Sequence, residues 1–72
     1  MWDTLSQRER EVLELLIQGL ANKQIALKLS ISTKRVEKIC TSIYQKIGVD
    51  SRASAIVWAL RQEKDDRDFP TS

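Results

Sequence analysis

The fold is decided by residues 22–46, NKQIALKLSISTKRVEKICTSIYQK. Apolar residues at positions 25, 26 and 29 have the spacing of one face of a helix over 22–29. After a short interruption, the hydroxyl of Ser32 can cap a second helix over 33–47. The apolar stripe of that helix consists of Val36, Cys40, Ile43 and Ile47. Two helices joined by a short turn, the second basic at its start, are typical of the helix-turn-helix of DNA-binding proteins.

A helix is also predicted before this pair. Ser6 and Glu9 have the spacing of a capping box, and Leu5 occupies the position of the hydrophobic staple, so we expect a helix over about 7–18. Gly19 follows its last residue, at a position that favours a positive φ. The buried stripe of this first helix is expected to consist of Val12, Leu13, Leu16 and Ile17.

The remaining boundaries are predicted from similar signals. Asn22 is expected to cap the helix over 22–29, and Gly48 is a second stop. Ser51 (or Asp50) is expected to cap a last helix. The predicted fold class is therefore all-α, with four helices over about 7–18, 22–29, 33–47 and 52–62. The expected organisation is a lead over 1–4, one helix-turn-helix domain over 5–62, and a charged, disordered tail over 63–72.

The helix over 52–62 has more apolar surface than one face packed on the core needs. Ala55, Ile56 and Ala59 share one face at about 100° per residue. The residues that point elsewhere are Val57, Trp58 and Arg61. An excess apolar face in a small domain indicates an interface, and self-association would help a core as small as this one. The alternative is that Trp58 folds back over the edge of the core.

Composition excludes several classes of protein. A chain of 72 residues predicts one small domain, and it contains no stretch near the roughly 20 apolar residues of a membrane span. The single Cys40 cannot form an internal disulfide, which fits a reducing cytosol, and it is expected to be a small core residue. Without histidine, neither a Ser-His or Cys-His pair nor a zinc site of the usual kind can form. The acidic residues are expected on solvated helix faces, so no enzyme, metal or cofactor is predicted.

Positive charge is concentrated in the middle of the chain. Residues 1–18 contain two basic and four acidic residues, for a net charge of −2. Residues 19–54 contain seven basic and two acidic residues, for +5, and residues 55–72 contain three basic and four acidic residues, for −1. The helix-turn-helix is therefore the segment expected to bind a polyanion.

Four blocks of sequence resemble the LuxR/NarL/GerE-type DNA-binding domain. These blocks are LSQREREVL (5–13), GLANKQIA (19–26), LSIS (29–32) and KIGV (46–49), and the resemblance spans about residues 5–62. It implies a bacterial, cytoplasmic, nucleoid-associated transcription regulator that binds double-stranded DNA as a homodimer. The helix over 33–47 would lie in the major groove, and RNA polymerase or another regulator is a possible further partner. Because the blocks start four residues after Met1, we expect either a small stand-alone regulator or an excised output domain.

Candidate DNA contacts follow from the outward positions of these helices. Lys34 and Arg35 can bind phosphates, Lys38 can reach guanine acceptors, and Thr41 and Gln45 can contact base edges. Further phosphate anchors are expected at Lys23, Lys46 and Arg52.

The sequence departs from the family pattern in the second helix of the pair. That pattern usually reads Thr-Val-Lys-x-His, whereas this chain has Arg35-Val36-Glu37-Lys38-Ile39. Glu37 could accept from a cytosine amino group, or pair with Lys34 or Thr41, and so change the specificity. Alternatively, Glu37 repels phosphate and Ile39 adds an apolar position, which would indicate a protein-interaction module on the same fold.

Overall fold

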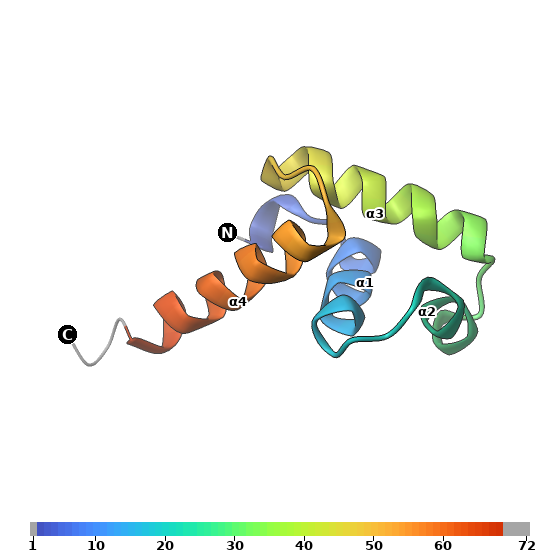
Figure 1. The fold of residues 1–72 in the computed structure, drawn as a ribbon, viewed down its shortest axis with the longest axis horizontal. Helices are drawn as coiled ribbons and strands as arrows, with labels where there is room; N and C mark the ends of the chain where they lie inside the picture. The colour runs from blue at the N-terminus through green and yellow to red at the C-terminus, as the bar shows by residue number, and fades with distance from the viewer. Residues whose placement is uncertain (1, 69–72) are drawn as a thin grey trace.

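The structure, a computed structural model, describes residues 2–68, with side chains described for residues 3–62. It contains a short 3-10 turn, η1 (Trp2–Thr4), and the α-helices α1 (Gln7–Ile17), α2 (Asn22–Leu29), α3 (Thr33–Ile47) and α4 (Arg52–Asp68). In Figure 1, α3 lies along the upper edge with α1 and α2 below it, and α4 extends away from the other three. The predicted all-α class with four helices is confirmed. No helix in the described part of the chain is long and apolar enough to span a membrane.

The predicted signals set most helix boundaries. At the start of α1, Ser6 Oγ accepts from the Glu9 N–H at 3.2 Å, and Glu9 Oε1 accepts from the Ser6 N–H at 2.8 Å. Ser32 Oγ accepts from the Arg35 N–H at 3.0 Å and caps α3. Gly48 ends α3 with φ of 76°, a left-handed conformation that glycine adopts without strain. Ser51 Oγ accepts from the Ser54 N–H at 3.1 Å, so Ser51 caps α4.

The predicted cap of α2 is wrong. Asn22 is the first helical residue, and the cap position is Ala21, which has no side chain that could accept a hydrogen bond. Gln24 Oε1 instead accepts from the Ala21 N–H at 2.8 Å, which is one half of a capping box. The Asn22 side chain is used in a tertiary contact, because its Oδ1 accepts from Arg52 Nη1 at 3.0 Å.

The predicted end of α4 at Gln62 is also wrong, because the helix continues to Asp68. Residues 63–68 are charged but include neither glycine nor proline, and charged residues do not break a helix. The first strong helix breaker is Pro70, which also disfavours the helical conformation of the residue before it. The tail expected to be disordered also includes residues 69–72, and these lie outside the part of the chain that the structure describes.

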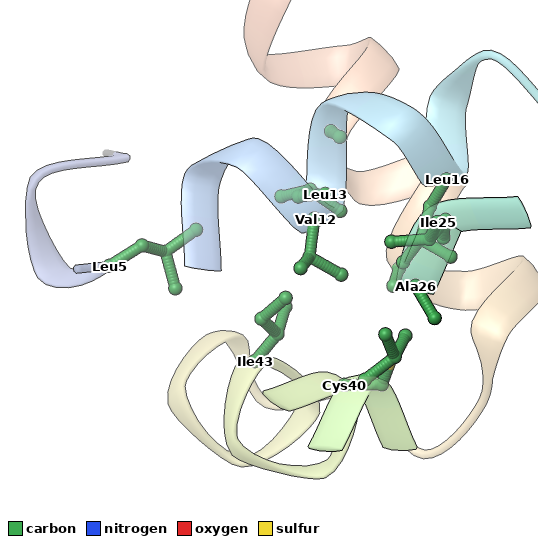
Figure 2. Close-up of a cluster of buried hydrophobic side chains, with 11 residues drawn as sticks. Leu5, Val12, Leu13, Leu16, Ile25, Ala26, Cys40 and Ile43 are labelled. Carbon is green, nitrogen blue, oxygen red and sulfur yellow. The ribbon is translucent and has the colours of Figure 1, made fainter. Parts of the chain in front are cut away.

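The core lies where α1, α2, α3 and the first turns of α4 meet. Its buried residues are Leu5, Val12, Leu13, Leu16, Ile25, Ala26, Val36, Cys40, Ile43, Ala55 and Ala59. Figure 2 shows Val12 of α1 and Ile43 of α3 pointing towards each other, with Ile25 and Ala26 of α2 beside them. Ile17 and Ile47, at the helix ends, are only partly buried. The core therefore holds α3 by one face and leaves its opposite face to solvent.

Candidate nucleic-acid interface

The exposed face of α3 carries a stripe of polar and basic side chains. Lys34, Lys38, Thr41 and Gln45 are all exposed and recur at steps of four, three and four residues. On a helix this stripe lies opposite the buried Val36 and Ile43. Side chains that project from one exposed helix face can enter the major groove of B-DNA together. We call these four residues the α3 stripe.

Glu37 lies at the edge of the α3 stripe and is exposed. Its backbone carbonyl accepts from Thr41 Oγ1 at 3.1 Å, which is a bond within the helix and does not involve the carboxylate. The predicted pairing of the Glu37 side chain with Thr41 is therefore not formed. The carboxylate remains at the surface as a possible acceptor.

A buried ionic contact ties α1 to α3. Glu9, expected on a solvated face, is only 7% exposed, so that expectation is wrong. Glu9 Oε2 accepts from Ser42 Oγ at 2.6 Å, and Glu9 Oε1 accepts from Lys46 Nζ at 2.9 Å. Burial alone would raise the pKa of Glu9, but the hydrogen bonds from Ser42, Lys46 and the Ser6 backbone outweigh it and lower the pKa to about 2. Lys46, a predicted phosphate anchor, is thus held in an intramolecular ion pair.

Arg52, another predicted anchor, is also held within the protein. Its guanidinium donates to Asn22 Oδ1 and to the backbone carbonyl of Leu20, and the residue is partly buried. These bonds join the start of α4 to the start of α2. Lys23, next to Asn22 in the first turn of α2, is exposed at the same place. The structure therefore brings Arg52 to the first turn of α2, the turn that also carries Lys23.

A second basic region lies between the start of α1 and the first half of α3. An open groove of about 620 Å³ is lined there by Arg8 of α1 and by Lys34, Arg35 and Lys38 of α3. Ile39 also lines this groove and is partly buried against the core, so it is not the freely exposed apolar position that we considered. Sequence reasoning missed Arg8, because only the packing of α1 on α3 brings it to this groove.

The predicted interface residues of α4 lie together. Val57, Trp58 and Arg61 line a shallow groove of about 390 Å³ with Val49, Ala53 and Ser54. Val57 is 47% exposed. Trp58 is partly buried and packs against the core, so it both covers the edge of the core and lines the groove.

The described residues contain no group that resembles a metal site. No three of their His, Cys, Asp or Glu side chains are placed to hold a metal ion. Cys40 is buried, and burial raises the pKa of its thiol, as is typical of a cysteine that packs as a small apolar residue.

Comparison with known proteins gives consistent matches. The family model described as bacterial regulatory proteins, luxR family, matches residues 3–59. The chain is 47% identical over 57 residues to the spore germination protein GerE of Bacillus subtilis, a match that covers 79% of this chain and 77% of GerE. It is 42% identical over 59 residues to the oxygen regulatory protein NreC of Staphylococcus aureus, covering 82% of this chain but 27% of NreC. The crystal structure of the response regulator ChrA from a heme-sensing two-component system superimposes with a TM-score of 0.77 at 49% identity, covering 82% of this chain and 29% of ChrA.

Proposed function

Because the chain belongs to the luxR family of bacterial regulatory proteins, we propose that it is a DNA-binding transcription regulator that reads a specific duplex site with α3. The observation that supports this proposal best is the α3 stripe. Its four side chains project from a helix that is capped at Ser32, ended at Gly48 and fixed to the core along its opposite face. A rigid helix can hold base-reading side chains in register with the base pairs.

Each position of the stripe has a chemical role in this proposal. Lys38 donates to the O6 and N7 acceptors of guanine, and the amide of Gln45 forms two hydrogen bonds with adenine. The Thr41 methyl group contacts a thymine methyl group, because its hydroxyl proton is used within the helix. Lys34 binds a phosphate at the start of α3. Glu37 accepts from the N4 amino group of cytosine at the edge of the stripe.

Phosphate contacts at the other end of the interface come from the start of α2. Lys23 is exposed there, and Arg52 is bonded to Asn22 in the same turn. The first N–H groups of a helix favour an anion, so the start of α2 adds to this attraction. We expect these groups to set the affinity and the orientation on DNA, and the α3 stripe to set the sequence.

A selection of random duplex DNA by the purified protein tests the proposal. We expect an enriched motif and expect the variant Lys38→Ala to bind it about 5- to 150-fold more weakly, since one good base contact contributes about 1–3 kcal/mol. Lys28→Ala is the matched control, because Lys28 is exposed in the last turn of α2 and is not part of the stripe. Absence of an enriched motif, or equal loss in both variants, would contradict the proposal.

The alternative function is a protein-interaction module, and the observation in its favour is the Glu37 carboxylate on the exposed face of α3. Salt dependence separates the two functions. Binding through phosphates weakens steeply between about 50 and 200 mM salt, because each neutralised phosphate releases counterions. A contact with a protein that is mainly apolar would be far less sensitive. The variant Glu37→Lys then tests specificity: a changed base preference next to the Lys38 position supports the role given to Glu37.

A further inference from the structure

The groove between α1 and α3 is a basic concave surface of which the proposed function uses only Lys34 and Lys38. Arg8 and Arg35 face it from two helices that are far apart in the sequence. Lys34 and Lys38 line the same groove from the side of the α3 stripe. Four cationic side chains around one open groove attract an anion that can reach several of them together.

The acidic residue in this groove does not oppose an anion. Glu9 lines the groove, but its carboxylate is buried and already bonded to Ser42, Lys46 and the Ser6 N–H. Its negative charge is balanced by Lys46 at 2.9 Å. The groove therefore presents the charge of its arginines and lysines.

The position of this groove relative to α3 identifies the anion. At about 100° per residue, Arg35 and Glu37 lie on nearly opposite flanks of α3, with the α3 stripe between them. Arg35 and Arg8 both line the groove on one of these flanks. A helix in the major groove has one sugar-phosphate backbone along each flank. The α1–α3 groove thus lies where one of these backbones would run, with an arginine of α1 beside α3.

We infer that the α1–α3 groove is a second phosphate-binding site for duplex DNA, in which Arg8 and Arg35 hold the backbone of one strand. This inference rests on the proposed function and adds Arg8 as a DNA ligand outside the helix-turn-helix. Arg8 provides a planar guanidinium that can donate two hydrogen bonds to one phosphate.

Arg8 can change partner at small cost. In the unbound protein its Nη1 lies 3.2 Å from Glu11 Oε1, in a pair whose two side chains are 45% and 38% exposed. Such exposed pairs contribute little to stability, so a phosphate can replace the Glu11 carboxylate.

The test compares Arg8→Ala with Glu11→Ala on the selected duplex and on a scrambled duplex. Both variants break the same ion pair, but only Arg8→Ala removes the cation. We expect Arg8→Ala to weaken binding of both duplexes by about three- to fivefold near 0.2 M salt. The negative slope of log K against log salt should become smaller in magnitude by about 0.9. Glu11→Ala is expected to bind at least as tightly as the wild type.

Replacing single phosphates of the duplex by neutral methylphosphonates locates the contact. At one position the neutral group should weaken the wild type but leave Arg8→Ala unchanged, because that variant has already lost the interaction. Equal binding by Arg8→Ala and the wild type at every salt concentration, or equal weakening by Glu11→Ala, would overturn the inference. Failure of the wild type to select any sequence would instead contradict the proposed function, so the two failures can be told apart.

Discussion

Glu9 has two structural roles that no other described residue combines. Its side chain accepts from the Ser6 N–H at the start of α1 and also from Ser42 and Lys46 of α3. A carboxylate in this place is stable only because these three donors replace the water that burial removes. In addition to the apolar core, this one side chain therefore links α3 directly to the start of α1.

We expect Glu9→Gln to destabilise the protein by about 1–3 kcal/mol at pH 7, because the variant keeps the size of the side chain but loses charge-assisted bonds at a buried site. The pKa of Glu9 is lowered from 4.5 to about 2 in the folded protein. Its stabilising effect is therefore present above about pH 4.5 and is lost as the pH falls towards 2. The measurement is urea unfolding at a series of pH values between 2 and 7.

Glu14→Gln is the control, since Glu14 is exposed on the same helix. The difference in unfolding free energy between the wild type and Glu9→Gln should shrink as the pH approaches 2. A difference that stays constant over this range would mean that the bonds of the ionised carboxylate are not the source of the effect.

At the scale of elements, α3 is the helix whose ends are set most locally. Ser32 caps its first turn and Gly48 ends it in a left-handed conformation. We expect Ser32→Ala to lower the free energy of unfolding by about 1 kcal/mol, because the Arg35 N–H loses its acceptor. Urea unfolding of this variant beside Thr33→Ala, an exposed neighbour outside the cap, measures the effect. An equal loss in both variants would assign it to helix propensity instead of capping.

The local character of these signals explains what could be predicted from the sequence. Each of these signals depends on only a few neighbouring residues: Ser6 with Glu9, Gly19, Ser32 and Gly48. The ends of α1 and α3, which these signals mark, were predicted to within one residue. The cap of α2 could not be predicted, because Asn22 is bonded to Arg52, thirty residues away. The contacts of Lys46 with Glu9 and of Arg8 with the groove likewise depend on how α1 packs on α3.

The whole molecule is small and its charge is unevenly distributed. The net charge of +2 hides a basic middle segment and acidic ends. The basic groove between α1 and α3 borders the α3 stripe at Lys34 and Lys38, whereas Val57, Trp58 and Arg61 line a groove on α4. The basic groove and the groove on α4 therefore share no lining residue.

We expect two copies to pair through α4, and Val57→Glu to prevent this pairing. Val57 is exposed, so a glutamate there leaves the core intact but puts a charge into an apolar contact, where it lacks a partner. Sedimentation equilibrium should show the dimer dissociation constant raised at least about tenfold, a change of about 1.4 kcal/mol or more. Leu27→Glu, on the 74% exposed Leu27 of α2, is the matched control and should leave the dimer unchanged. On DNA, Val57→Glu should keep the affinity for a single half-site and lose the tighter binding to paired half-sites. A variant that still dimerises like the wild type would show that α4 does not join the two copies.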